Sequence, residues 1–358
     1  MAQRGGRART RRRGHVVLKS IEPDASRSPY YIYTPAYTRF SAGIRCLHLL
    51  CHWLNRSGEP AYLVIMGKHR GPATRPDLLA PLLTPGVVAA HFSQGRCPVV
   101  VYPEILAGNP AGAGRVVRYV MNFPGLLGGE ARFEASEMIY AYSGELARAC
   151  GVPGNVLHMP VLDRTVFTHT PARARKGACF YAAKYQEELG QTVSGLPEGA
   201  VEITRNRSDS QTPAEIAELF RSSEYFYAFE NTALSTEAVL CGCPAVLMPG
   251  PLFTSSIAVE ELGWDGYAWG DSPLELERAK STVDQGRLNY QKTIDAFPAS
   301  LARFIAKTQD FARGHGYRKP VDCPDLQVGD IKALIRSKVH WTLPERARLA
   351  LFVLRSGV

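Results

Sequence analysis

The chain has 358 residues, a hydrophobic content of 45% and a formal net charge of +9. This length accommodates two domains of ordinary size, and the composition is that of a globular protein. No run of about 18 uncharged apolar residues occurs, and no apolar segment follows the basic N-terminus. We therefore expect a cytoplasmic protein that has neither a membrane span nor a signal peptide.

Much of the positive charge lies at the start of the chain. Six arginines fall within the first 13 residues, among glycines. We expect residues 1–28 to form a disordered basic tail. Such a tail is either a solvated leader or a segment that attracts the anionic inner face of a membrane. Because no aromatic residues interleave with the arginines and no nucleic-acid motif occurs, we expect no specific nucleic-acid partner.

The cysteines argue against a metal centre. Cys46, Cys51, Cys241 and Cys243 lie in apolar or helix-end contexts, which favours buried thiols. Cys241 and Cys243 are separated by one residue, which is the wrong spacing for a zinc site, and no second pair follows. We therefore expect no metal and no resident cofactor.

Residues 29–160 alternate between apolar runs and helical patterns, which predicts a Rossmann-like α/β domain. The first strand is predicted at Val16–Leu18 or at Tyr30–Tyr33, and a helix over Ile44–Asn55 follows Ser41, a plausible N-cap. Further strands are predicted at Ala61–Met66, Val99–Tyr102, Val116–Met121, Met138–Tyr142 and Asn155–Met159, with Ser143 capping a helix over Gly144–Cys150.

Three first-domain residues are candidates for a ligand cleft. Gly43 and Arg45 lie where the first helix begins, and a small residue there allows a ligand close approach to the backbone. Asn122 follows a predicted strand, at the end where ligands bind in open α/β sheets. Turn and capping roles are the alternatives for Gly43 and Asn122.

A second α/β domain is predicted over residues 161–310. The strand Ala178–Ala182 is followed by Lys184, and the strand Val201–Thr204 is followed by Arg205 and Arg207. Cations at strand ends suit phosphate oxygens, although solvated surface charge is an equally good explanation. A helix over Pro213–Arg221 comes next.

The segment from Tyr225 to Met248 predicts a complete strand–helix–strand unit. An aromatic strand, Tyr225–Phe229, precedes a helix over Ala233–Cys241 that is capped by Asn231 or Thr232. Gly242 suits the positive φ of a helix C-cap, and a strand over Ala245–Met248 follows. Thr254 or Ser255 is expected to cap a later helix.

Two acids lie at the ligand-binding end of this unit. Glu230 follows the strand, and Glu237 lies about one and a half turns into the helix at about 3.6 residues per turn. The helix N-terminus offers N–H groups and a positive dipole end to a diphosphate. Carboxylates accept hydrogen bonds from ribose or sugar hydroxyls. Together these features favour a nucleotide-sugar site, and a capped core helix with solvated acids is the alternative.

The segment resembles the donor-site signature of GT-B glycosyltransferases, most closely those of family 4. Glu237-Ala238, Gly242, Pro244 and Val246 match its second half, whereas the spacing of the two acids and the lack of a Gly-Phe-Gly turn depart from it. Phe229-Glu230-Asn231 and Thr236-Glu237 also resemble paired motifs of α-fucosyltransferases. The segment Pro160–Phe167 is similar to the family 4 linker that precedes the second domain.

The resemblance implies GT-B architecture, with two Rossmann-like doubly wound domains facing a cleft. It implies an acceptor-side domain at residues 29–160, a nucleotide-sugar donor domain at 161–310 and a helical segment at 311–358 that packs back on the first domain. Glu230 is then the catalytic candidate, and Lys184, Arg205, Asn231, Thr232 and Glu237 bind the donor. Gly43, Arg45 and Asn122 belong to the acceptor side.

The function implied is transfer of a hexosyl or deoxyhexosyl group from a nucleotide-diphosphate sugar to a glycan or lipid-linked acceptor, in cell-envelope polysaccharide biosynthesis. The nucleotide sugar is a co-substrate. No Asp-x-Asp motif occurs in the chain, which predicts metal independence. A nucleotide-sugar 2-epimerase of the same fold is one alternative. A non-catalytic GT-B relic that binds glycan or anionic lipid is another.

Overall fold

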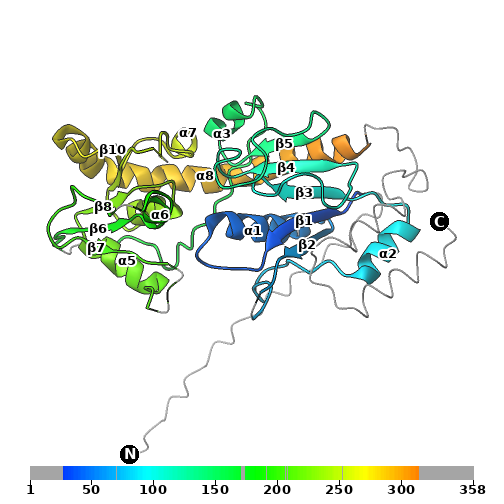
Figure 1. Ribbon diagram of the computed structural model, residues 1–358, viewed down its shortest axis with the longest axis horizontal. Coiled ribbons are helices and arrows are strands. Elements are labelled where there is room, and N and C mark those ends of the chain that lie inside the picture. Colours follow the sequence, from blue (N-terminus) through cyan, green and yellow to red (C-terminus); the bar gives the residue numbers. More distant parts are fainter. Residues whose placement is uncertain are drawn as a thin grey trace, which may run out of the picture.

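The computed structural model describes residues 27–69, 71–170, 174–190, 192–205, 207, 209–251 and 253–313. Within them the chain forms two five-stranded parallel sheets, each with its own helices (Figure 1). Almost all of the predicted basic tail and most of the segment 311–358 lie outside the described residues, as does the alternative first strand at Val16–Leu18. The expectations for those segments, including membrane contact, stay predictions.

The first sheet has the strand order β2-β1-β3-β4-β5. Its central strands β3 and β4 are buried at every residue, as expected for parallel strands covered on both faces. The bounds are β1 Tyr30–Pro35, α1 Ala42–Arg56, β2 Ala61–Met66, α2 Pro85–Ser93, β3 Val99–Pro103, β4 Val116–Val120, β5 Met138–Ala141 and α3 Gly144–Ala149.

The second sheet has the order β10-β9-β8-β6-β7, which is the same winding as in the first sheet. In each sheet the chain direction across the sheet reverses between the first and third strands, where open α/β sheets bind ligands at the carboxyl ends. The bounds are β6 Ala178–Tyr181, α4 Ala183–Leu189, β7 Val201–Glu202, α5 Pro213–Ser222, β8 Tyr225–Ala228, α6 Ala233–Leu240, β9 Ala245–Leu247, α7 Val259–Leu262 and β10 Tyr267–Trp269.

The predicted strand–helix–strand unit is present as β8, α6 and β9. Thr232 caps α6 by accepting a hydrogen bond from the N–H of Leu234 at 3.3 Å. Gly242 has a φ of 77°, and a Cβ there would lie 2.5 Å from the ring of His169. Arg175 donates to the carbonyl of Cys241 at 2.8 Å, which satisfies the C-terminal end of the helix.

Several elements differ from the sequence expectations. The predicted strand Asn155–Met159 makes only one parallel bridge, Ala141 to Val156. Helix α7 begins after Ala258 without a side-chain cap, so the expected capping by Thr254 or Ser255 is wrong. Helix α2 was not predicted, because its residues are apolar on nearly all sides and give no helical stripe.

The linker motif has a local physical explanation. The carboxylate of Asp163 accepts hydrogen bonds from the N–H and hydroxyl of Thr165 at 2.9 Å and 2.6 Å, which fixes a turn. The side chain of Phe167 then enters the second-domain core. Asp163 therefore fixes the turn that precedes the second domain, and Phe167 anchors the chain in the core of that domain.

Helix α8, Pro273–Arg313, contributes to both cores. Its first half packs on the second domain through Tyr290, and its second half packs on the first through Phe297, Leu301 and Phe304. At about 1.5 Å per residue such a helix extends about 60 Å, and Figure 1 shows it running from one sheet to the other. The residues that pack back on the first domain thus begin before residue 310, where the sequence placed the boundary.

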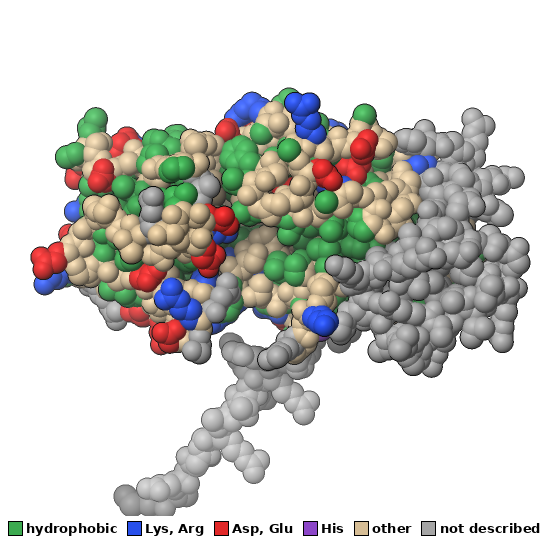
Figure 2. Space-filling model, in the orientation of Figure 1, with side chains coloured by type: hydrophobic (Ala, Val, Ile, Leu, Met, Phe, Trp, Pro, Cys, Tyr) green, Lys and Arg blue, Asp and Glu red, His purple; other side chains and the backbone are tan. Residues whose placement is uncertain are grey.

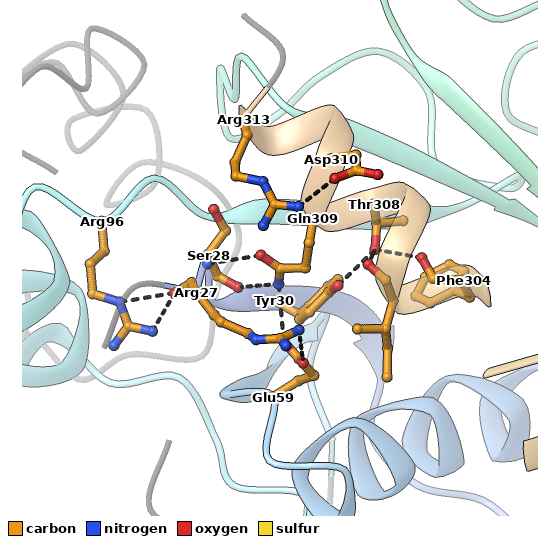
Figure 3. Close-up of polar contacts among 11 residues, drawn as sticks. Arg27, Ser28, Tyr30, Glu59, Arg96, Phe304, Thr308, Gln309, Asp310 and Arg313 are labelled. Carbon is orange, nitrogen blue, oxygen red and sulfur yellow. Dashed lines mark hydrogen bonds and ion pairs between the residues drawn. The ribbon is translucent and has the colours of Figure 1, made fainter. Parts of the chain in front are cut away.

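Polar contacts fix the end of α8 to the first sheet (Figure 3). The hydroxyl of Thr308 lies 2.6 Å from that of Tyr30 in β1. The side chain of Gln309 donates to the carbonyl of Ser28 at 3.0 Å and to Glu59 at 3.1 Å. Because these groups are buried, their hydrogen bonds fix the position of α8 on the first sheet.

We predict that Gly286→Ala destabilises the protein, although alanine normally favours a helix interior by about 1 kcal/mol. A Cβ at this position of α8 would lie 2.2 Å from the carbonyl oxygen of Asp265. We expect the free energy of unfolding in urea to fall by about 2 kcal/mol. The exposed Ser281→Ala on the same helix is the control, and equal stability of the two variants would contradict close seating of α8.

Candidate functional site

A cleft of about 530 Å³ lies between the two sheets, at the carboxyl ends of their strands. Figure 2 shows the recess between the second domain, on the left, and the first domain, on the right. Seven of the nine sequence-predicted site residues line it, namely Gly43, Asn122, Lys184, Arg205, Glu230, Asn231 and Thr232. The chain reversal points of both sheets therefore face a common space.

The N-terminus of α6 forms much of the second-domain wall. Thr232 and Ala233 line the cleft there, beside Ser235 in the first turn of the helix. The hydroxyl of Ser235 is buried and has no hydrogen-bond partner among the described residues. A buried hydroxyl without a partner is costly unless a ligand satisfies it. Ser235 is thus a site residue that the sequence did not single out.

Glu230 lies at the end of β8 and lines the cleft. Its Oε2 accepts the backbone N–H of Lys184 at 2.7 Å, so it caps α4, whose own N-cap residue is Ala182. Burial raises the pKa of Glu230, while Lys184 and the backbone hydrogen bonds lower it. The carboxylate is therefore held in one orientation and still has lone pairs for sugar hydroxyls.

Lys184 carries a partly exposed positive charge at the cleft. Its side chain is 42% exposed, and Nζ lies 3.9 Å from Glu230 Oε1. An ion pair this loose and exposed contributes little to stability. The ammonium group is therefore free to turn towards an anion in the cleft.

Asn231 has structural partners. Its amide donates to the carbonyl of Ser255 at 3.0 Å and accepts the N–H of Ile257 at 3.1 Å. These bonds tie the N-terminal end of α6 to the loop before α7. Asn231 therefore shapes the wall of the cleft, and Thr232 caps the helix.

Glu237 and Arg45 are buried and do not line the cleft. Arg45 Nη2 of the first domain is 3.3 Å from Glu237 Oε1, and Arg205 Nη2 is 3.9 Å from Glu237 Oε2. Arg205 also donates to the carbonyl of Phe40 in the first domain at 2.6 Å. These four residues, which we name the interdomain clasp, hold the domains together. From the sequence, we expect Glu237 to accept hydrogen bonds from the ribose hydroxyls and Arg205 to bind the donor diphosphate.

Glu104 is the main residue that the sequence did not assign. It follows the residues of β3 and lines the cleft from the first domain, 4% exposed. Its Oε2 accepts the backbone N–H of Met121 at 3.0 Å. Burial raises the pKa of Glu104 to about 7, although the backbone hydrogen bonds and Lys184 lower it. The one sequence signal for Glu104 as a site residue is its position directly after a strand.

His158 also lines the cleft without a sequence prediction. Its ring packs on Tyr142 with centroids 4.5 Å apart, and neither ring nitrogen makes a well-formed hydrogen bond to a described residue. Burial lowers the pKa of His158 to about 4, so the ring is neutral at pH 7. A neutral imidazole can accept or donate one hydrogen bond to a ligand.

Gly43 lies in the first turn of α1, beside the side chain of Met121. A Cβ there would meet the side chain of Met121 at 3.7 Å, which is ordinary contact. The glycine is therefore not required by packing, and its lack of a side chain leaves the cleft wider. Asn122 accepts the N–H of Phe123 at 2.9 Å and shapes the neighbouring turn.

Two negative findings apply to the described residues. Among them, no three His, Cys, Asp or Glu side chains lie close enough to hold a metal ion. No helix in the part of the chain that the structure describes has the length and apolar character needed to cross a membrane. Metal independence stays a prediction.

No protein-family model and no curated protein matches the chain. Solved structures that are similar include the calicheamicin glycosyltransferase CalG4, with 12% identity, a TM-score of 0.38, and coverage of 81% of this chain and 100% of that chain. WaaG, a glycosyltransferase involved in lipopolysaccharide biosynthesis, has 11% identity, a TM-score of 0.39 and coverage of 80% and 100%. An O-GlcNAc transferase variant from Thermobaculum terrenum has 11% identity and a TM-score of 0.44, and the match covers 84% of this chain and 71% of that chain.

Identities this low carry no information on reaction or substrate. The fold is evident from the molecule itself. Two parallel sheets of the same strand order face a common cleft, which is the GT-B architecture that the sequence predicts. Membership of family 4 stays a prediction.

We predict that Gly129→Ala is much more damaging than Gly128→Ala. Both glycines have positive φ, at 76° and 93°. A Cβ on Gly129 would lie 2.1 Å from the carbonyl oxygen of Glu104, whereas a Cβ on Gly128 meets nothing within 4 Å. We expect Gly128→Ala to cost about 1 kcal/mol of unfolding free energy through backbone strain alone. Gly129→Ala should cost about 2 kcal/mol more, and equal losses in urea unfolding would argue against this close approach.

We predict that Glu237→Gln destabilises the protein, because a buried arginine loses its charged partner. The expected loss is about 2 kcal/mol in urea unfolding. Glu218→Gln is the matched control, since Glu218 pairs with Arg221 at the surface and its side chain is 51% exposed. Unchanged stability together with weakened nucleotide binding would instead indicate that Glu237 contacts ribose.

Proposed function

We propose that this protein is a glycosyltransferase that moves a hexosyl or deoxyhexosyl group from a nucleotide-diphosphate sugar to a glycan or lipid-linked acceptor. One observation carries the proposal. Lys184 and the N-terminus of α6 on the second domain face the carboxylate of Glu104 on the first domain across one cleft. Groups that can stabilise a leaving diphosphate thus lie opposite a carboxylate that can accept a hydrogen bond from an acceptor hydroxyl.

The donor diphosphate binds at the N-terminus of α6. The N–H groups of the first turn and the helix dipole favour an anion there. Lys184 adds a full positive charge, and Ser235 adds a hydroxyl that has no partner among the described residues. Because these groups also stabilise the negative charge that develops on the leaving group, no divalent ion is needed. Full activity in the presence of a chelator would support this point.

The sugar lies beside Glu230. Its carboxylate is fixed by the N-terminus of α4 and lines the cleft next to Lys184. Accepting hydrogen bonds from sugar hydroxyls would orient the anomeric carbon towards the first domain. A contact between Glu237 and ribose requires the interdomain clasp to open, because both carboxylate oxygens face arginines.

The rim of the cleft favours an acceptor with an apolar part. Ile105 and Leu127 on the first domain and Trp264 on the second line the cleft, and each is between 40% and 41% exposed. Exposed apolar side chains concentrated at a binding site mark contact with an apolar ligand or partner. A lipid-linked acceptor satisfies this rim better than a purely polar glycan does.

The alternatives differ in simple observations. A 2-epimerase would release nucleoside diphosphate and an epimerised free sugar without any acceptor. A non-catalytic binding module would leave nucleotide sugars intact. The carboxylate of Glu104 facing the donor wall favours catalysis, because a binding module has no use for a buried acid there.

We predict that Lys184→Met weakens nucleoside-diphosphate binding about tenfold, because one charge-assisted contact to phosphate is lost. The binding of the corresponding nucleoside should change by less than about twofold, since it lacks the diphosphate. Calorimetry with UDP, GDP, ADP and dTDP, each against its nucleoside, measures both effects. Lys280→Met, at an exposed position of α8, is the control for removal of a positive charge. Equal effects on nucleotide and nucleoside would contradict a diphosphate site at Lys184.

A further inference from the structure

The carboxylate of Glu104 is held rigidly on the first-domain wall. Its Oε2 accepts the N–H of Met121 at 3.0 Å, and the backbone of Asn122 also donates to it. Behind it, the loop carrying Gly129 packs on the Glu104 carbonyl so closely that no side chain fits. The orientation of the carboxylate is thus fixed before any ligand binds.

A second rigid contact supports the loop after Glu104. The guanidinium of Arg118 pairs with Glu137 at 2.7 Å and donates to the carbonyls of Leu106 and Gly108 at 2.5 Å and 2.7 Å. Arg118 is 1% exposed, so this network is shielded from water. The structure therefore places a buried acid on a rigid support, which is the arrangement that general acid–base catalysis needs.

Glu104 faces the second-domain side of the cleft, where Lys184 and the N-terminus of α6 lie; we name this side the donor wall. Lys184 is the cation that acts on Glu104, across the cleft from the second domain. Glu187, Glu230 and His158 line the same cleft. Among the described residues, Glu104 also acts on the pKa of Cys46 on α1, Tyr119 on β4 and Cys150 after α3. Burial raises the pKa of all three, so they are neutral at pH 7. Lys184 is thus a cationic neighbour of Glu104 that a donor diphosphate would engage.

We propose that Glu104 is the general base that removes the proton from the acceptor hydroxyl, and that the transfer inverts the anomeric configuration. This inference rests on the proposed function. The acceptor oxygen forms a bond to the anomeric carbon while the bond from that carbon to the diphosphate oxygen breaks. The proton passes to Glu104, and the nucleoside diphosphate leaves with the electron pair, facing Lys184 and α6.

Inversion follows from the positions of the two walls. The leaving group lies on the second domain and the base on the first, so the attacking hydroxyl approaches from the side opposite the departing diphosphate. Glu230 does not lie on that opposite side, because it is on the second-domain wall and caps α4 beside Lys184. A double displacement would therefore use Glu104 itself as the nucleophile and would retain the configuration, so the anomer released first separates the two roles of this carboxylate.

The raised pKa of Glu104 to about 7 sets the expected pH dependence. The base must be ionised to accept a proton, so turnover should rise as the pH increases through about 7 and then level off. Removing the carboxyl should abolish this dependence. The same burial opposes ionisation in the folded protein, so the carboxyl favours folding at low pH and loses that contribution as the pH rises through 7.

The test uses water as the acceptor, so no natural acceptor is needed. Wild type and Glu104→Gln are compared in hydrolysis of UDP-glucose, GDP-mannose, ADP-glucose and dTDP-glucose. We expect Glu104→Gln to lower the hydrolysis rate about 100-fold or more. The affinity for the matching nucleoside diphosphate should change by less than about threefold, because the donor wall is untouched. Glu134→Gln, an exposed first-domain position, is the control.

Two further readouts separate catalysis from folding. Glu104→Gln should melt higher than wild type at pH 8.5 and close to wild type at pH 5, since glutamine does not ionise. The rise of the wild-type hydrolysis rate through pH 7 should be absent in the variant. A variant that is as stable as wild type or more so, yet inactive, is the signature of a functional group.

Proton NMR at early times identifies the released anomer. All four donors carry an α-linked sugar, so inversion yields the β anomer first. Release of the α anomer first, or wild-type hydrolysis by Glu104→Gln, would overturn the role of Glu104 while intact nucleotide binding left the proposed function standing. Failure of wild type to bind any of the four diphosphates would overturn the proposed function and, with it, this inference.

Discussion

The burial of one helix in two separate cores is the constraint on which the rest of the structure depends. Helix α8 packs on the second domain through Tyr290 and on the first through Phe304, and its end is fixed by buried hydrogen bonds from Thr308 and Gln309. The interdomain clasp adds a charged contact between the same two domains. Together they set the separation of the two sheets. A cleft of defined width exists because neither domain can shift without exposing part of α8.

Repetition of one winding then gives the cleft its chemistry. Both sheets reverse direction between their first and third strands, so each presents strand ends and helix N-termini to the same space. The second domain contributes positive potential through Lys184 and α6, and the first contributes the buried acid Glu104. An acid and a cation on opposite walls can act on two ends of one reacting bond. Either domain alone would offer only half of this arrangement.

Several polar residues near the cleft serve the scaffold. Glu230 caps α4, Asn231 holds the loop before α7, and Arg205 reaches the first-domain carbonyl of Phe40. Buried polar groups require such partners, because an unpaired one costs free energy. At the cleft, the hydroxyl of Ser235 has no hydrogen-bond partner among the described residues. A ligand bound there would complete its hydrogen bonding.

The sequence by itself determined the α/β class, most strands, the unit from Tyr225 to Met248 and the position of Glu230 at a strand end. These follow from local periodicity, caps and glycines, which act within a few residues. Only the tertiary structure decided that Glu237 pairs with Arg45, that Glu104 faces Lys184 and that α8 enters both cores. Those outcomes depend on which distant residues become neighbours and on how deeply each charge is buried. No local pattern encodes either quantity, because both are set by the packing of one domain against the other.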